Sequence, residues 1–220
     1  MTRPADLVVT NAEVHTLADP DETHEAFAVR DGRVVRLGTT YDVEFLAGAD
    51  TTTIDAGGRV AIPGLIDAHT HLLNAGRTLV HADLSAADSA DEAVALLRER
   101  AAAVAEGEWV LGFGYDESTW DESRPLTRED LHAVSETAPV VAFREDMHVA
   151  SVNDPVFERL RGEMPDGDVR TEGGEPTGVI VEEAVDPVYE AIEPDAAEAE
   201  ELIRAVQSTA NERGVTMVHD

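Results

Sequence analysis

The pattern of apolar and polar positions divides the chain into two parts of different character. Up to about residue 58, short apolar runs of β-favouring residues alternate with polar turns. Two of these runs, at 26–29 and 34–38, flank Asp31-Gly32, a pair that favours a tight hairpin because both central turn positions need positive φ. Residues 1–58 are therefore predicted to form a small antiparallel β unit, too thin to be stable unless it packs against other structure.

From residue 59 onward, apolar runs typical of buried strands alternate with helical patterns. The runs begin at Val60, Trp109, Pro139 and Val215. Helices are predicted at about 89–107, 129–134 and 195–213, with a further helix that opens at Asn153. This alternation indicates an α/β fold with parallel strands. The acidic, glycine-rich stretch 162–178 is predicted to be an exposed loop.

The charge of the chain narrows the classes of partner. Asp and Glu number 46 against 16 basic residues, all of them arginine, which gives a net charge of -30. Such a field repels phosphate backbones and anionic headgroups, so we expect a small-molecule substrate and neither nucleic acid nor membrane as partner, while a homodimer stays open. Because 43% of the residues are hydrophobic, we expect folded structure under this acidic surface.

Features absent from the sequence indicate the cellular compartment and the kinds of atom that could bind a metal ion. There is no cysteine, so a metal ion has to be held by nitrogen and oxygen ligands. No apolar stretch has the length needed to span a bilayer, and the first residues do not resemble a signal peptide. We expect a cytoplasmic protein, and the dense carboxylates indicate the cytoplasm of a salt-adapted organism, where they hold water and oppose aggregation.

The sharpest chemical signal is His69-Thr70-His71 at the end of an apolar run. On a strand, side chains at i and i+2 face the same way, about 6–7 Å apart, which is close enough to share a metal ion. Asp67 would lie on the same face, as a further polar group or as a hydrogen-bond partner that orients an imidazole. The alternative is a pair of solubilising histidines at a strand end.

The residues around this pair resemble a known family. The run from Pro63 to Leu72, with Asp55-Ala56-Gly57-Gly58 upstream, is similar to the signature of the amidohydrolase superfamily. Its members hold one or two divalent metals at the mouth of a (β/α)₈ barrel. The resemblance implies that 1–58 belongs to a small β-sandwich built from the leading strands, and that 59–220 is the first, N-terminal portion of the barrel.

Further stretches follow the order of one branch, the YtcJ-like enzymes, which include proteins like N-substituted formamide deformylase. These stretches are Gly112–Trp120, Pro125–Leu131, Asp146–His148 with Asn153, Gly173–Ile180 with Glu182, and Gly214–Asp220. The resemblance covers nearly the whole chain and implies an inserted segment at about 109–190. Two departures concern the substrate pocket: Met147 stands where glycine is common, and Ser151 where an aromatic residue is common.

The resemblance assigns roles residue by residue. His69 and His71 would be metal ligands. Asp116, Trp120 and His148 would lie in the inserted segment and shape the substrate pocket. The simpler alternatives are that Trp120 packs a loop and that His148 satisfies a buried backbone carbonyl.

Three further residues are candidates for the site. Glu182 is one, although Glu182-Glu183 also reads as an ordinary solvated helix start. His219 and Asp220 follow a predicted barrel strand, where catalytic residues collect, and the alternative there is a frayed end. The catalytic base is expected beyond Asp220, and the chain has no lysine to supply the carboxylated lysine that many superfamily members use. We therefore expect the chain to be a truncated portion of the domain.

The implied reaction is hydrolysis of a non-peptide carbon–nitrogen bond, in an amide or a formamide. A divalent metal, with zinc as the first choice, would activate water and polarise the carbonyl group. Two alternatives stay open. One is a hydrolase of cyclic amidines, like imidazolonepropionase, and the other is a non-catalytic acidic module derived from the same fold.

Overall fold

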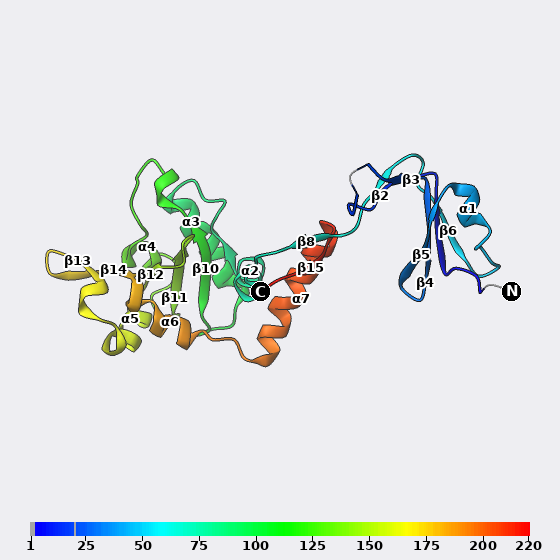
Figure 1. The fold of residues 1–220 in the computed structure, drawn as a ribbon. Helices are drawn as coiled ribbons and strands as arrows, with labels where there is room; N and C mark the ends of the chain where they lie inside the picture. The colour runs from blue at the N-terminus through cyan, green and yellow to red at the C-terminus, as the bar shows by residue number, and fades with distance from the viewer. Residues whose placement is uncertain (1–2, 20) are drawn as a thin grey trace. The chain divides into compact units, whose positions relative to one another are not determined.

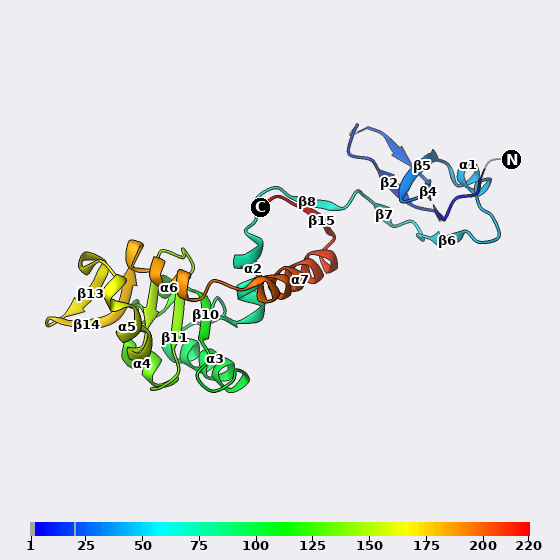
Figure 2. The same cartoon turned by 90° about the horizontal axis from the view of Figure 1, so that it is seen from below.

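In the computed structural model, which describes residues 3–19 and 21–220, the chain forms two compact units. The first comprises the described residues up to Ile66 together with Gly214–Met217. The second comprises Asp67–Arg213 and Val218–Asp220. Each unit has its own sheets (Figures 1 and 2), and each is described by itself.

The first unit contains a four-stranded sheet in the order β5-β4-β1-β6. Its strands are β1 (Leu7–Thr10), β4 (Ala26–Arg30), β5 (Arg33–Gly38) and β6 (Thr52–Asp55). The predicted hairpin is confirmed: β4 and β5 pair antiparallel, and Asp31 and Gly32 have φ values of 50° and 72°. A second sheet has the order β3-β2-β7. Its strands are β2 (Glu13–His15), β3 (Thr23–His24) and β7 (Val60–Ala61).

The prediction of a purely antiparallel unit is wrong, because β1 pairs parallel with β6. A parallel pair needs a crossover connection, and here the connection after β5 includes α1 (Thr40–Glu44). Thr39 and Asp42 form a capping box at the start of α1, and the fully buried Val43 joins the core of the sheet. This helix is one turn long, so its periodicity is too short to read from the sequence.

The strand that leads to the histidine pair was predicted to be buried, and this is also wrong. β8 (Leu65–Asp67) pairs only with β15 (Val215–Val218) in a two-stranded sheet. Leu65 and Ile66 are 50% and 58% exposed. A two-stranded sheet has no third strand or helix to cover its apolar side chains, so the apolar run stays exposed to solvent.

The second unit is built on a six-stranded sheet in the order β13-β14-β12-β11-β10-β9. Its strands are β9 (Ala82–Asp83), β10 (Val110–Tyr115), β11 (Val140–Arg144), β12 (Val149–Val152), β13 (Val169–Glu172) and β14 (Glu175–Val181). β10 and β11 are parallel, as the sequence predicts, and β9, which the sequence pattern did not indicate, is parallel to β10, whereas β12, β13 and β14 are antiparallel. The fold is therefore mixed α/β, and the described residues do not close a barrel.

The antiparallel half of this sheet corrects the prediction for 162–178. That stretch was expected to be an exposed loop, but it contains β13 and most of β14. Gly173 and Gly174 have φ values of 62° and 92° and form the turn between the two strands. The glycines and acids belong to the exposed tip of this hairpin, while Val169 and Ile180 are buried in the core.

Helices cover both faces of the six-stranded sheet (Figures 1 and 2). They are α2 (Leu72–Val80), α3 (Ala90–Ala103), α4 (Arg128–His132), α5 (Asp154–Leu160) and α6 (Asp186–Ala191), while α7 (Ala196–Glu212) packs against α2. The predicted start signals are confirmed for α3, where the Ser89 hydroxyl accepts from the Glu92 amide, and for α7, where Asp195 and Glu198 form a capping box. No helix among the described residues is long and apolar enough to cross a membrane.

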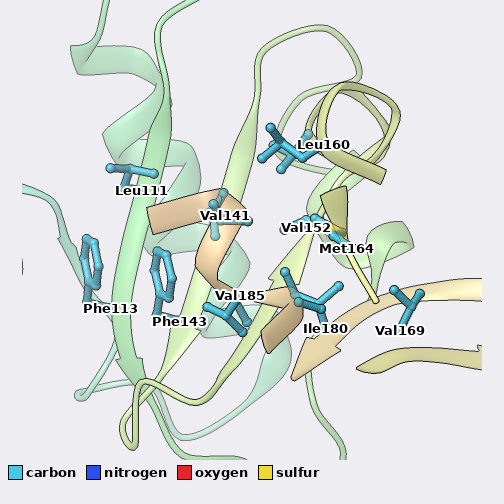
Figure 3. Close-up of a cluster of buried hydrophobic side chains, with 14 residues drawn as sticks. Leu111, Phe113, Val141, Phe143, Val152, Leu160, Met164, Val169, Ile180 and Val185 are labelled. Atoms are coloured by element: carbon cyan, nitrogen blue, oxygen red, sulfur yellow. The ribbon is translucent and has the colours of Figure 1, made fainter. Parts of the chain in front are cut away.

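Alternation along β11 shows how the two faces are filled. Val141 and Phe143 point to the cluster that α5 and α6 cover (Figure 3), where the rings of Phe113 and Phe143 stack with centroids 4.8 Å apart. Val140 and Ala142 point to the opposite cluster, beneath α3 and α4. The period of two that defines a strand thus builds two cores from one sequence run.

Candidate metal and substrate site

His69 and His71 lie close together, but not by the geometry that the sequence predicts. Strand β8 ends at Asp67, so the two histidines occupy the connection to α2, and His71 is the residue that precedes this helix. The Asp67 carboxylate accepts a hydrogen bond of 3.1 Å from the His69 amide, which makes an Asx turn and ends the strand. The two rings are 5.3 Å apart between centroids, at 84° to each other. A turn, rather than strand alternation, brings the imidazoles together.

The end of β15 lies beside this connection. The His219 amide donates to the Asp67 carbonyl at 2.9 Å, and the Thr70 amide donates to the His219 carbonyl at 3.0 Å. These two backbone bonds fix the connection that carries the histidines against the last residues of the chain. His219 is thus placed next to the pair through its backbone.

Asp220 contacts the helix and a histidine at once. One of its carboxylate oxygens accepts from the Leu72 amide at 3.1 Å, in the first turn of α2. The other oxygen lies 3.6 Å from Nδ1 of His71. A carboxylate at this end of a helix is stabilised by the helix dipole. The structure therefore gathers His69, His71, His219 and Asp220 around one turn.

The donor atoms at this turn suit a divalent ion in kind but fall short in number. Imidazole nitrogen and carboxylate oxygen are the ligands that Zn²⁺ accepts in sites without cysteine. However, among residues 3–19 and 21–220 no group of three or more His, Asp or Glu side chains is arranged to hold a metal ion. The His71 and Asp220 side chains are 67% and 48% exposed, which leaves room for further ligands.

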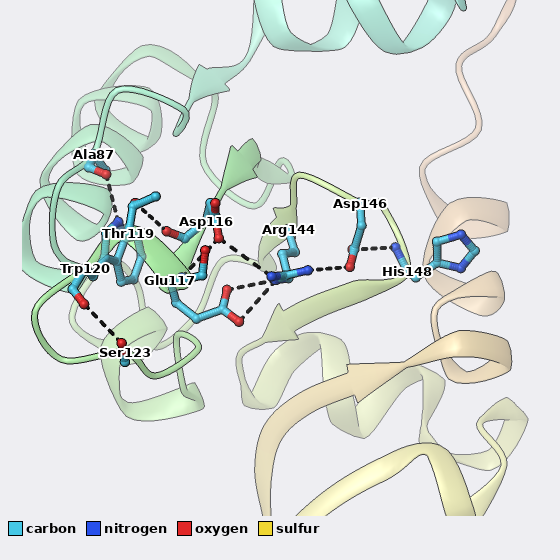
Figure 4. A network of polar contacts seen from close by, with 10 residues as sticks. Ala87, Asp116, Glu117, Thr119, Trp120, Ser123, Arg144, Asp146 and His148 are labelled. Atoms are coloured by element: carbon cyan, nitrogen blue, oxygen red, sulfur yellow. Dashed lines mark hydrogen bonds and ion pairs between the residues drawn. The ribbon is translucent and has the colours of Figure 1, made fainter.

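Asp116 belongs to a charged network that ties together the ends of β10 and β11 (Figure 4). The Arg144 guanidinium lies 3.6 Å from Asp116, 2.9 Å from Glu117 and 2.5 Å from Asp146. Hydrogen bonds from Arg144 to Glu117 and Asp146 raise the pKa of the guanidinium further above its ordinary value. The side-chain and backbone groups of Ser118 hold the pKa of Asp116 below its usual range. The Asp116 carboxylate is thus ionised and accepts its hydrogen bonds from Ser118, two residues further along the same loop.

Trp120 has the geometry of a packing residue. The residue is 3% exposed, and its Nε1 donates to the Ala87 carbonyl at 2.8 Å (Figure 4). Its ring stacks on Tyr115. Burial raises the pKa of Tyr115 to about 12, so its phenol stays neutral. This arrangement is the loop-packing alternative given above for Trp120.

His148 and Glu182 are brought together at the surface of the second unit. Nδ1 of His148 lies 3.3 Å from the Glu182 carboxylate, and both side chains are exposed. The Glu182 amide donates to the His148 carbonyl at 2.9 Å, and Glu182 starts a short 3₁₀ helix with a φ of 47°. In Figure 4 the imidazole points away from Arg144. These two candidates form a pair with each other, and within residues 3–19 and 21–220 the His148 side chain makes no hydrogen bond to a backbone carbonyl.

The two family departures have local physical reasons. Met147 has a φ of 64°, a left-handed conformation that glycine adopts without strain, which accounts for a glycine preference at this position. Ser151 is fully buried, donates to the Leu126 carbonyl at 2.6 Å and lies 3.2 Å from the Tyr115 hydroxyl. An aromatic side chain at this position would displace that buried polar contact.

Sequence reasoning did not find Arg144, the cation on which the network depends. The signal was present, because Arg144 follows four apolar residues at the carboxyl end of β11, where functional groups collect in parallel sheets. Three acids lie within ion-pair distance of it: Asp116 and Glu117 follow β10, and Asp146 follows β11. Their convergence is visible only in the fold.

Comparison with known proteins identifies the family. A model described as "Amidohydrolase family" matches residues 52–220. The chain is 29% identical over 188 residues to the putative amidohydrolase YtcJ of Bacillus subtilis, which covers 82% of this chain and 36% of that protein. It is 28% identical over 233 residues to an N-substituted formamide deformylase of Arthrobacter pascens, with coverage of 100% and 43%.

A solved structure agrees with these relatives. An uncharacterized metal-dependent hydrolase from Pyrococcus furiosus superposes with a TM-score of 0.74 at 25% identity, over 96% of this chain and 43% of that one. The chain thus spans less than half the length of each of these proteins. The matched family model and the two curated relatives lead to one conclusion: this chain belongs to the amidohydrolase family, in the branch that resembles YtcJ.

Proposed function

We propose that this chain is part of a metal-dependent hydrolase that cleaves a non-peptide carbon–nitrogen bond, in an amide or a formamide, with His69 and His71 among its zinc ligands. The observation that carries the proposal is the grouping of two imidazoles and the Asp220 carboxylate around one turn between a strand and a helix. The similarity to N-substituted formamide deformylase supports the choice of bond. The small-molecule substrate is part of this proposal.

His69 and His71 would hold a divalent ion at this turn, and such an ion would polarise the carbonyl group and lower the pKa of water towards neutrality. The chain's own residues set the geometry around it. Asp67 holds the His69 backbone through the Asx turn, and Asp220 lies 3.6 Å from Nδ1 of His71, where a closer approach would orient that ring. The remaining ligands and the base that shuttles the proton are proposed to lie outside these 220 residues.

Zinc titration of the metal-free chain tests the metal site. We expect weak binding of one ion by wild type and loss of that binding in the double variant His69→Ala, His71→Ala, because each imidazole supplies one donor nitrogen. The matched control is His15→Ala, His132→Ala, which removes two imidazoles that pair with Glu13 and Asp154 and is expected to keep the zinc affinity. Isothermal titration calorimetry measures both. Equal zinc affinity in wild type and in the His69, His71 double variant contradicts the proposal and favours a non-catalytic module.

The substrate class is tested in the same preparation and in the product of the complete reading frame. We expect formate release from N-benzylformamide by the complete product and none by the 220-residue chain, because two imidazoles alone leave the ligand set unfinished. Preference for a cyclic amidine would redirect the proposal to the cyclic-amidine class while leaving the metal site intact. Formate release by the 220-residue chain itself would contradict the view that its site is unfinished.

A further inference from the structure

The second unit contains a cavity of about 390 Å³ at the amino ends of β9 and β10. Its walls come from the end of α2, the end of α3, the residues that open β10, and the connection from α6 into α7. The cavity exists because α7 lies directly on α2: a Cβ atom on Gly76 would stand 2.7 Å from Cβ of Leu202. Its volume falls in the range of small-molecule sites.

Two arginines, Arg77 and Arg100, line this cavity, and the Glu193 carboxylate acts on Arg77 only through space. Arg77 is 9% exposed, and its guanidinium donates to Asn74 and lies 5.8 Å from the ring centroid of Tyr189. The Nε atom of Arg100 is buried and has no hydrogen-bond partner. Within the part of the chain that the structure describes, neither arginine forms an ion pair. Buried donors without partners are costly, so such donors point to a ligand that satisfies them.

His81 lies between the two arginines and carries no charge at neutral pH. Its Nδ1 is 3.4 Å from the Arg100 guanidinium. Burial, followed by the charges of Arg100 and Arg77, lowers the pKa of His81 to about 4. The neutral imidazole therefore accepts from Arg100 and does not add to the positive charge. The inner polar surface consists of two guanidinium groups that are charged at every physiological pH.

The outer part of the cavity has the opposite charge. Four glutamates line it, and all four are exposed: Glu108, Glu193, Glu198 and Glu201. A simple anion has to pass these carboxylates in a chain that already carries a net charge of -30. A ligand with a cationic group at the mouth and an anionic group inside matches both layers. Apolar side chains, including Trp109, Ile192 and Leu202, also line the cavity.

We propose that this cavity binds a small zwitterion with an apolar side chain, in the class of the apolar α-amino acids. The ligand carboxylate is held by the guanidinium groups of Arg77 and Arg100, and the ammonium group faces the glutamates at the mouth. Planar guanidinium groups suit a carboxylate because they offer parallel donors. The cavity lies at the far end of α2 from His71, about 13 Å along a nine-residue helix, so this binding does not depend on the proposed metal site.

Calorimetric titration of the 220-residue chain with L-leucine tests the proposal. We expect saturable one-to-one binding in wild type, and clearly weaker binding of 4-methylpentanoate, which lacks the ammonium group, and of 3-methylbutylamine, which lacks the carboxylate. Quenching or enhancement of tryptophan fluorescence accompanies binding and disappears in Trp109→Phe, while the heat of binding persists. Absence of saturable L-leucine binding into the millimolar range overturns the proposal, as does equal affinity for 4-methylpentanoate.

Variants separate the two charge layers. Arg100→Gln is expected to weaken L-leucine binding about tenfold or more, the effect of losing a charge-assisted hydrogen bond. The matched control is Arg98→Gln, on the same helix, whose guanidinium donates to the Ala133 carbonyl and does not line the cavity. Affinity unchanged in Arg100→Gln, with the fold intact by circular dichroism, overturns the proposal.

Substitution of the glutamates is expected to change the affinities of two ligands in opposite directions. The exposed double variant Glu198→Gln, Glu201→Gln is expected to bind L-leucine more weakly and 4-methylpentanoate more tightly than wild type, because it removes negative charge from the mouth. Both side chains are exposed, and Gln at position 198 keeps an acceptor oxygen for the Asp195 amide in the capping box of α7, so the start of the helix is preserved. If both ligands gain affinity together, the site selects a simple anion and the zwitterion assignment is overturned.

Discussion

The β8–β15 pair and the six-stranded sheet of the second unit use similar apolar sequence runs and treat them differently. In the six-stranded sheet, Val141 and Phe143 of β11 are fully buried between helices and neighbouring strands. In the two-stranded pair, Ile66 and Met217 are 58% and 52% exposed. The candidate metal ligands follow the exposed pair. The difference shows that an apolar run in the sequence predicts a strand but not its burial. Whether the strand is buried depends on the strands and helices that pack against it.

The largest expected effect is on stability, and it separates the two regions directly. Phe143→Ala removes a ring that stacks on Phe113 and Tyr189, and should lower the free energy of unfolding of the second unit by about 3–5 kcal/mol. Ile66→Ala on the exposed pair should change it by about 1 kcal/mol or less. Urea unfolding followed by circular dichroism measures both. A loss for Ile66→Ala as large as that for Phe143→Ala would mean that β8 is covered in solution.

A smaller effect is the pH dependence of the free energy of unfolding that His81, the residue after α2, is expected to cause. The folded-state pKa of His81 is about 4, below its unfolded value of about 6.5. In the unfolded chain this histidine takes up a proton that the folded state excludes, so stability is full above pH 6.5 and falls as the pH drops towards 4. His81→Gln should flatten that part of the stability profile, measured by unfolding at a series of pH values. The same slope in His81→Gln and wild type would place its origin elsewhere.

The smallest effect concerns the strained turn after β11. Met147→Gly removes the cost of a left-handed φ and also loses the packing of a partly buried side chain. The two changes oppose each other, so the free energy of unfolding should move by about 0.5 kcal/mol or less. Met164→Gly, at a buried position with a φ of -89°, is the matched control and should cost about 2–5 kcal/mol. Equal losses in the two variants would show that packing, not φ, decides at Met147.

Much of the second unit follows from its sequence because its signals are local. Ser89 and Asp195 cap helices with strong start signals, and β10 and β11 are apolar runs of ordinary strand length. The hairpin of β13 and β14 was missed because its glycine-rich tip dominates the local composition. Pairing partners are non-local, so neither the parallel β1–β6 pair nor the antiparallel half of the large sheet could be read from sequence patterns alone.

The candidate site shows the same limit. Proximity of His69 and His71 was predicted from strand geometry, whereas the structure achieves it through the Asx turn at Asp67. The contact of Asp220 with His71 joins residues at opposite ends of the barrel portion, and only the pairing of β8 with β15 creates it. The roles of Asp116, Trp120, His148 and Glu182 in substrate binding stay predictions.

The contact between Asp220 and the first turn of α2 also bears on the entropy of ligand binding. The Leu72 amide holds one carboxylate oxygen, so the rotamer of Asp220 is restricted while its other oxygen faces His71. Ordering a free side chain on binding costs up to about 1 kcal/mol. For Asp220 this entropy is lost when the first turn of α2 folds, so it is not lost again when an ion binds. An ion that binds beside His71 would therefore contact an Asp220 oxygen whose position is already fixed by the hydrogen bond to the Leu72 amide.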